Sequence, residues 1–143
     1  MLNHEITKEE IAAIYPKVAA IVSDALGREA AEVKPDVSLI ADLGAESIDF
    51  LDIVFRLERA FKVKIPRGKL VEDARGPLSE SEFESGGVVS EAGLARLKAY
   101  LNEVPAERFK TPLNVSEIPR LLTTETFCKI VIRQQRAAGA QSA

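Results

Sequence analysis

One serine in this chain stands between two carboxylates, at the point where a loop gives way to an amphipathic run. Ser47 has Glu46 before it and Asp49 two residues after it, within the segment DLGAESIDFLDI, residues 42–53. Serine is a preferred N-cap, so the pattern predicts a helix that begins near Ile48 with Ser47 as its cap. Such a serine points its hydroxyl into solvent at the positive end of a helix dipole, where an attached phosphate is favoured.

The same residues also have a purely structural interpretation. Any helix can begin with serine and place acids in its first turn, and each such choice is worth only about 0.5–2 kcal/mol. A catalytic serine is disfavoured, because the segment around Ser47 lacks the second glycine of a nucleophile elbow and no strand is expected before it. The one histidine, His4, lies in a terminus that we expect to be loose, so a Ser-His-acid relay is not expected.

Composition places the chain among ordinary globular proteins and excludes several functional classes. Its 143 residues are enough for one domain with a real core, 46% are hydrophobic and 29% are charged. A formal charge of −3 gives no reason to expect nucleic acid as a partner, and one cysteine excludes an internal disulfide. No Cys/His cluster is present for a metal, and neither a signal peptide nor a membrane span is recognisable. The expected location is the cytoplasm.

Helical spacing dominates the first half of the chain. A capping box at Thr7 and Glu10 precedes an apolar pattern that ends at the stop signal Gly27, with Pro16 predicting a kink or a short leading turn. Residues 28–46 read as a long loop pinned by apolar anchors. A second helix is predicted over 48–61, with an apolar stripe wider than one packing seam requires.

The second half reads as helices separated by polar, turn-rich segments. A helix is predicted over 91–102 behind the cap Ser90, a short segment over 116–122, and a last helix over 125–136. The last helix carries Cys128 on its apolar side, where a buried and inert thiol is expected. Residues 137–143 are expected to fray. No region alternates long enough to demand a sheet, so the predicted class is all-α.

The segment around Ser47 resembles the attachment site of acyl carrier proteins. The resemblance rests on the lead-in Asp42-Leu43-Gly44, on Ser47 between its acids, and on Lys64-Ile65-Pro66 after the helix; it runs from about Ile14 to Pro66 and resumes near Pro119. It implies one domain, 1–143, built as a four-helix bundle with an insertion at about 67–115 between the second and third helices. It also implies that a separate transferase attaches 4′-phosphopantetheine from coenzyme A to Ser47, and that acyl groups travel on this arm as thioesters.

The resemblance implies two further sets of residues and a set of partners. The docking positions that face partner enzymes fall on Asp42, Glu46, Ile48, Asp49, Asp52, Arg56, Glu58 and Arg59. The positions that line an acyl pocket fall on Leu43, Phe50, Leu51, Val54, Leu57, Phe61, Ile65 and Phe127. The implied partners are a phosphopantetheinyl transferase and acyl-loading, condensing and acyltransferase enzymes. The protein itself is expected to be a monomer without catalytic activity, without a metal and without stable membrane insertion.

Arg56 and Arg59 depart from an ordinary fatty-acid carrier, which tends to be neutral or acidic at these positions. They are explained either by helix-dipole complementarity with an Asp52–Arg56 pair, or by a dedicated set of partners. The run 50–55 looks most like specialised bacterial carriers that supply very long or hydroxylated acyl chains to lipid A, which also carry extra sequence after Ile-Pro. Two alternatives stay open: a carrier-like interaction module without an arm, and a carrier of aminoacyl or ketide units.

Overall fold

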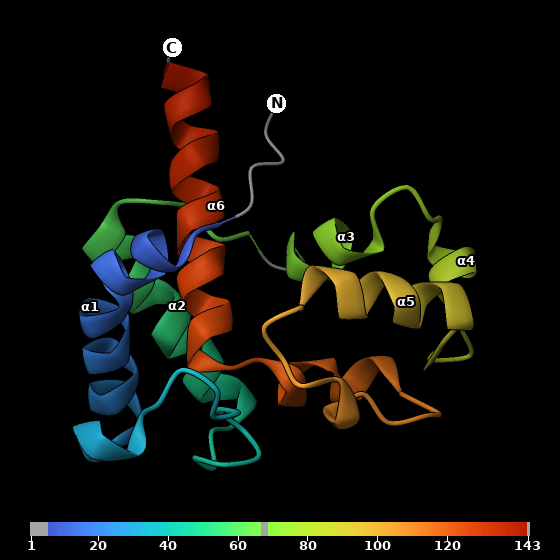
Figure 1. Cartoon of the computed structure of the whole chain (residues 1–143), viewed down its shortest axis with the longest axis horizontal. Coiled ribbons are helices and arrows are strands. Elements are labelled where there is room, and N and C mark those ends of the chain that lie inside the picture. The colour runs from blue at the N-terminus through green and yellow to red at the C-terminus, as the bar shows by residue number, and fades with distance from the viewer. Residues whose placement is uncertain (1–5, 67–68, 143) are drawn as a thin grey trace. The chain divides into compact units, whose positions relative to one another are not determined.

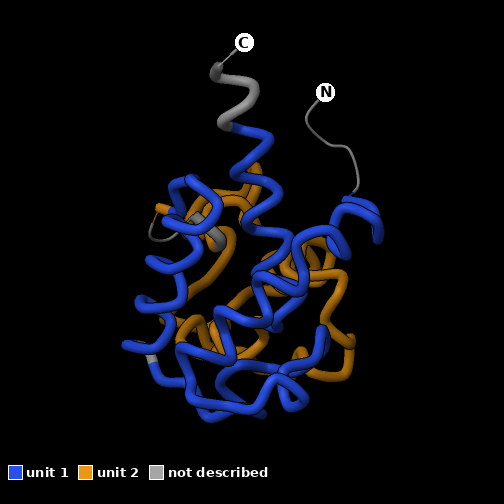
Figure 2. Tube along the Cα trace, turned by 90° about the vertical axis from the view of Figure 1, so that its left-hand side faces the viewer, with its two compact units in different colours: residues 1–65, 123–143 blue, residues 66–122 orange. Residues whose placement is uncertain are grey.

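The computed structural model of the chain describes residues 6–66 and 69–142, apart from the side chains of Ser47, Lys69, Leu70 and 138–142. Helices make up most of it, which confirms the predicted all-α class (Figure 1). The chain divides into two compact units (Figure 2). Unit 1 contains residues 1–65 and 123–143, and unit 2 contains residues 66–122.

Unit 1 is built on three long helices among its described residues. These are α1 (Lys8–Leu26), α2 (Ser47–Phe61) and α6 (Thr124–Ser142), with the short 3₁₀ helix η1 (Ala30–Glu32) after α1. Helix α1 packs against both α6 and α2. The fully buried side chains of this unit include Val18 and Val22 of α1, Ile53 and Leu57 of α2, and Val131 of α6.

The ends of α1 are those that the sequence predicts. The Thr7 hydroxyl accepts a hydrogen bond from the Glu10 N–H at 3.1 Å, and the Glu10 carboxylate accepts one from the Thr7 N–H at 2.9 Å. Gly27 closes the helix in the left-handed region at φ 64°. Pro16 lies inside α1, so the helix runs unbroken from Lys8 instead of being preceded by a separate leading turn.

Helix α6 begins with a reciprocal pair of threonines and ties the two ends of unit 1 together. The Thr123 hydroxyl accepts from the Thr126 N–H at 3.2 Å, and the Thr126 hydroxyl accepts from the Thr123 N–H at 3.1 Å. Near its far end, Arg136 forms an ion pair with Glu10 at 2.7 Å. The helix continues to Ser142, past the expected fray point at 137, and fraying of residues 137–143 stays a prediction.

Unit 2 consists of short elements around a core of its own. They are α3 (Lys69–Arg75), α4 (Glu80–Phe83), β1 (Glu84–Ser85), β2 (Val88–Val89), α5 (Glu91–Tyr100), η2 (Ala106–Arg108) and η3 (Val115–Leu121). Strands β1 and β2 form an antiparallel hairpin, and Val89 N–H donates to the Leu113 carbonyl at 2.8 Å. The large buried side chains include Phe83, Leu97 and Ile118.

Several details of unit 2 differ from the sequence expectations. The cap Ser90 and the start of α5 are as predicted, since the Ser90 hydroxyl accepts from the Gly93 N–H at 2.9 Å. The polar stretch before it forms two short helices and the hairpin instead of a simple loop. The short segment predicted over 116–122 is the 3₁₀ helix η3, which begins at Val115 behind the cap Asn114 and belongs to unit 2. Among the described residues, no helix is long and apolar enough to cross a bilayer.

Replacing Gly93 by alanine should destabilise unit 2. A Cβ there would lie 2.4 Å from the Phe83 carbonyl oxygen and 3.0 Å from side-chain atoms of Phe83 and Val89. The gain in helix propensity of about 1 kcal/mol is smaller than the expected clash, so we expect a net loss of about 1–2 kcal/mol. Amide hydrogen exchange of residues in unit 2 measures this loss of stability. The control Ala92→Ser adds one atom on the exposed side of the same helix; equal protection in both variants contradicts the close approach at Gly93.

Candidate functional site

The loop before α2 is held by Arg28 in a defined conformation. The Nε and Nη2 groups of Arg28 both donate to the Leu43 carbonyl, at 3.2 and 3.0 Å. The Nη1 group of Arg28 donates to the Glu32 carboxylate at 3.1 Å. Gly44 follows at φ +74°, a conformation that L side chains rarely adopt. The lead-in residues Leu43 and Gly44 are therefore constrained by a planar guanidinium that bridges two parts of the loop.

A second set of contacts fixes this loop to the start of α6. The Asp42 carboxylate accepts from the Ser38 N–H at 2.7 Å. Ser38 is buried and forms an isolated antiparallel bridge with Thr123, and the Glu125 N–H donates to the Pro35 carbonyl at 3.0 Å. The loop that leads to Ser47 is therefore anchored to a helix that follows almost eighty residues later in the chain.

Helix α2 begins one residue earlier than the sequence predicts. Glu46, not Ser47, is the N-cap residue, and Ser47 is the first helical residue. The reason is local: the Asp49 carboxylate accepts from the Glu46 N–H at 2.8 Å, so the first turn closes on Glu46. The side chain of Ser47 lies outside the described residues, and its attachment role stays a prediction.

The surroundings of Ser47 suit a covalently attached phosphodiester arm. The preceding Glu46 is exposed and the following Ile48 is 70% exposed, so the helix start is open to a second protein. The first N–H groups of α2 have no acceptor within the helix and, with the helix dipole, favour a phosphate. The carboxylates of Glu46 and Asp49 oppose this effect, and both lie where water screens them.

The predicted docking residues differ in what they do within unit 1. Asp42 and Asp49 accept the backbone hydrogen bonds described above, and Glu58 accepts from the Ile65 N–H at 2.8 Å. Asp52 pairs with Arg56 at 3.1 Å, which is the i,i+4 pair expected from the sequence. These carboxylates thus have structural partners as well as charge. The docking role of the set stays a prediction.

The predicted acyl-pocket residues divide into two groups. Leu43, Leu57 and Phe127 are buried, whereas the rest are partly exposed: Phe50, Leu51, Val54, Phe61 and Ile65. The ring of Phe50 meets that of Phe127 edge-on, with centroids 5.5 Å apart and planes at 86°. The apolar flank of α2 is therefore only partly covered, and the pocket itself stays a prediction.

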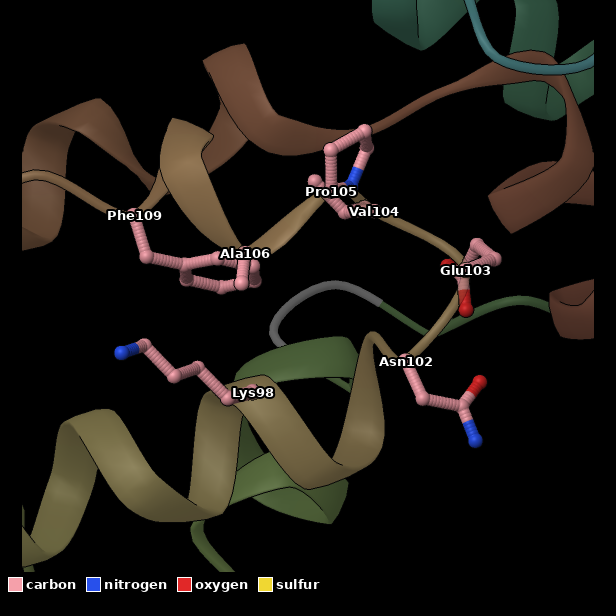
Figure 3. Close-up of a pocket in the computed structure, with 7 residues that line it drawn as sticks. All are labelled: Lys98, Asn102, Glu103, Val104, Pro105, Ala106 and Phe109. Atoms are coloured by element: carbon pink, nitrogen blue, oxygen red, sulfur yellow. The ribbon is translucent and has the colours of Figure 1, made fainter.

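A cavity is present in unit 2, and sequence reasoning missed it. It has a volume of about 330 Å³ and lies between the end of α5 and the segment 103–109 (Figure 3). Figure 3 shows Lys98 on α5, Asn102 just after the end of that helix, and Phe109 across from Lys98. The lining residues are Lys98, Asn102, Glu103, Val104, Pro105, Ala106 and Phe109. None of the predicted acyl-pocket residues lines it, and no sequence signal marks it because it forms where two local segments meet.

Sequence reasoning also missed the exposure of Phe55, which it counted only as part of a wide apolar stripe. Phe55 is 54% exposed, whereas Ile53 and Leu57 on either side of it in sequence are fully buried. A signal was available: at 100° per residue, Phe55 falls on the same face as Asp52 and Arg59 and opposite Leu57. Polar neighbours at i−3 and i+4 mark that face as solvent-exposed.

Comparisons with known proteins point to one family. Residues 16–75 match the family model described as "Phosphopantetheine attachment site". An "Acyl carrier protein AcpXL" of Rhizobium etli is 38% identical over 72 residues, which cover 50% of this chain and 78% of that protein. Its namesake from Rhizobium meliloti strain 1021 is 35% identical over 74 residues, covering 51% and 78%. No solved structure matches.

The single thiol of the chain should be unreactive in the folded protein. Cys128 is buried, and burial, with a smaller effect of the Glu125 charge, raises the pKa of its thiol to about 12. A raised pKa favours the neutral thiol, so at pH 8 the folded protein holds roughly a thousandfold less thiolate than an ordinary cysteine. With the unmodified protein, Ellman's reagent should react slowly at pH 8, faster as pH rises, and at once in urea. Fast reaction at pH 8 without urea contradicts this burial.

Proposed function

Because this chain belongs to the acyl carrier protein family, we propose that Ser47 is the residue that bears its 4′-phosphopantetheine arm. The protein is an acyl carrier protein, and this arm is its cofactor. The observation that carries the proposal is position: Ser47 is the first residue of α2, after a loop clamped by Arg28 and between the exposed residues Glu46 and Ile48. It is a helix start that a transferase can reach.

The residues of the chain have distinct tasks in this proposal. When bound, the arm supplies a thiol on which acyl groups are held as reactive thioesters. Arg28 and Asp42 hold the lead-in loop, and Asp49 holds the first turn of α2, so Ser47 is presented on a rigid element. We propose that the docking set around α2 recognises the phosphopantetheinyl transferase and the acyl-loading, condensing and acyltransferase enzymes.

Hiding the acyl chain is the second proposed task. Each buried CH₂ group is worth about 0.8 kcal/mol, so eight of them represent about 6 kcal/mol. The partly exposed flank Phe50, Leu51, Val54, Phe61 and Ile65 supports the idea that an acyl chain lies against α2. The buried members of the set, such as Phe127, would have to move aside to admit it.

The kind of cargo is proposed from the relatives. Because two matching relatives are both called AcpXL, and because the run after Ser47 resembles specialised carriers, we propose a long or hydroxylated acyl chain used in lipid A or related lipid synthesis. We further propose that the protein works as a monomer in the cytoplasm, where coenzyme A is available, and that it catalyses nothing itself.

The attachment proposal is tested by mass. The protein is incubated with coenzyme A, magnesium and a broad-specificity phosphopantetheinyl transferase. Wild type should gain the mass of one phosphopantetheine, because Ser47 supplies the only hydroxyl at the start of α2. Ser47→Ala should gain nothing, whereas the matched control Ser79→Ala, which alters the cap of α4, should be modified fully. No gain in wild type with several transferases favours an interaction module without an arm.

The cargo proposal is tested on the protein from its own host. Intact mass of the purified holo-protein, before and after hydroxylamine cleavage of thioesters, identifies the acyl groups bound to it. Acyl chains that are hydroxylated or longer than those of the housekeeping carrier purified in parallel are expected. Aminoacyl or ketide units in their place support the alternative, a carrier of such units in a secondary pathway. The same short acyl chains on both carriers contradict the proposed specialised cargo.

A further inference from the structure

The cavity in unit 2 is large enough for a small ligand, and nothing in the proposed function uses it. Its volume is about 330 Å³, which is near the lower end of the range for ligand pockets. A group the size of a water molecule takes about 30 Å³ of liquid volume, so the cavity has room for roughly ten such groups. Three of its lining residues, Lys98, Asn102 and Ala106, are exposed, so the cavity is open to solvent.

The wall of the cavity opposite α5 is held by short-range hydrogen bonds. The Val104 N–H donates to the Leu101 carbonyl at 2.9 Å, directly after the end of α5. Farther along, the Phe109 N–H donates to the Ala106 carbonyl at 3.1 Å and closes η2. These bonds form within the chain itself, so the wall is formed in advance and a ligand does not have to order it.

This wall is apolar where it is most deeply buried. Val104 and Phe109 are only 4% and 6% exposed, and Pro105, which follows Val104, is half-buried. All three residues line the cavity. An apolar group that contacts them is removed from water, and this burial is the main source of affinity in small-ligand sites.

One cation lines the cavity without an anionic partner. The Lys98 ammonium forms no ion pair and no hydrogen bond with any residue in the described ranges, 6–66 and 69–142. Figure 3 shows the Lys98 side chain extending away from Asn102 and Glu103, toward the side of the cavity where Phe109 lies. A negative group bound beside the Lys98 ammonium is therefore kept away from the Glu103 carboxylate.

The segment that forms the cavity has a charge opposite to that of the whole chain. Residues 96–110 contain the basic side chains Arg96, Lys98, Arg108 and Lys110, and the acidic side chains Glu103 and Glu107. The segment is therefore net positive, whereas the chain has a formal charge of −3. One lysine balances one negative charge, so a carboxylate fits this site better than a phosphate monoester, which carries nearly two charges at pH 7.

We propose that this cavity binds a small monocarboxylate of roughly ten non-hydrogen atoms. Its apolar body lies against Val104 and Phe109, and its carboxylate pairs with the Lys98 ammonium. The site lies within unit 2 and includes no residue near Ser47, so it does not depend on the proposed function. That function does supply one source of the ligand. When water replaces sulfur at the acyl carbon of a thioester, the products are a carboxylate, a thiol and a proton.

The test is an NMR titration of the full-length, unmodified protein with its amide nitrogens isotope-labelled. The probes are octanoate and phenylpropanoate, which share the carboxylate and differ in the apolar body. Octylamine, octyl phosphate and acetate are the comparison probes, because they change the sign of the charge, its size, or the apolar body.

Two variants remove the two proposed contacts. Lys98→Gln removes the charge, and Ala106→Leu fills the cavity from an exposed position. The matched controls Lys34→Gln and Ala99→Leu make the same changes at exposed residues that do not line the cavity. Circular dichroism verifies that each variant is folded.

At least one of the two carboxylates should shift the amide signals of residues 98–109 and saturate with a Kd below about 1 mM. Lys98→Gln should weaken this binding about fivefold, since a partly exposed ion pair is lost. Ala106→Leu should weaken it by about tenfold or more, since the leucine side chain occupies the space of the ligand. Both controls should bind like wild type. Octylamine and octyl phosphate should bind more weakly than octanoate, and acetate should not saturate.

Several results overturn the proposal. They are the absence of saturable binding by both carboxylates, equal or tighter binding of octylamine or octyl phosphate, unchanged affinity in either variant, and an equal loss in the controls. Shifts confined to α2 and α6 also overturn it, because they report an amphiphile bound to unit 1. Ser47→Ala should bind the carboxylate like wild type. Failure of the attachment test at Ser47 removes the thioester source of the ligand and leaves the site itself intact.

Discussion

The carbonyl of Leu43 accepts two hydrogen bonds from one guanidinium, and the geometry of the site depends on this contact. Arg28 stands directly after the end of α1, so its bonds to Leu43 join the exit of one helix to the entrance of the next. Hydrogen bonds from a charged donor are worth about 1.5–3 kcal/mol, which is enough to select one loop conformation. Gly44 adopts a left-handed backbone conformation, with φ of +74°, at the turn that precedes α2.

The beginning of α2 combines two opposed electrostatic effects. The N–H groups of the first turn and the helix dipole favour a negative group at Ser47, whereas the carboxylates of Glu46 and Asp49 disfavour it. Asp49 is retained for a reason that the structure makes explicit, because its carboxylate accepts from the Glu46 N–H and closes the first turn. The same acid thus supports the fold and contributes charge near Ser47. Substitutions there change both properties at once.

The two units differ in how they obtain stability. Unit 1 buries long helices against each other, and its loop is tied down by the bridge between Ser38 and Thr123. Unit 2 has short helices that would be marginal alone, and it relies on local caps and close approaches, such as Gly93 against the Phe83 carbonyl. Residues 66–122 therefore form a compact unit with its own core, of which the insertion expected at 67–115 is the larger part.

The sequence alone determined those features whose causes lie within a few residues. The capping box at Thr7, the stop at Gly27 and the Asp52–Arg56 pair all follow from spacing along one helix. The prediction that Ser47 is the attachment residue rests in the same way on residue type and order within a short segment. Even so, the cap fell on Glu46, since a carboxylate three residues later decided which N–H closed the turn.

Only the tertiary structure decided which faces and segments meet. Spacing did not reveal that the Asp42 carboxylate would accept from the Ser38 N–H or that Phe50 would pack on Phe127. Nor did it reveal that residues 103–109 would line a cavity with the end of α5. The spacing of apolar residues placed Phe55 in the apolar stripe of α2, although its side chain is largely exposed to solvent. The physical reason is that burial is a property of two surfaces. The sequence of one helix shows which of its sides is apolar, but the elements packed against it determine how much of that side is buried.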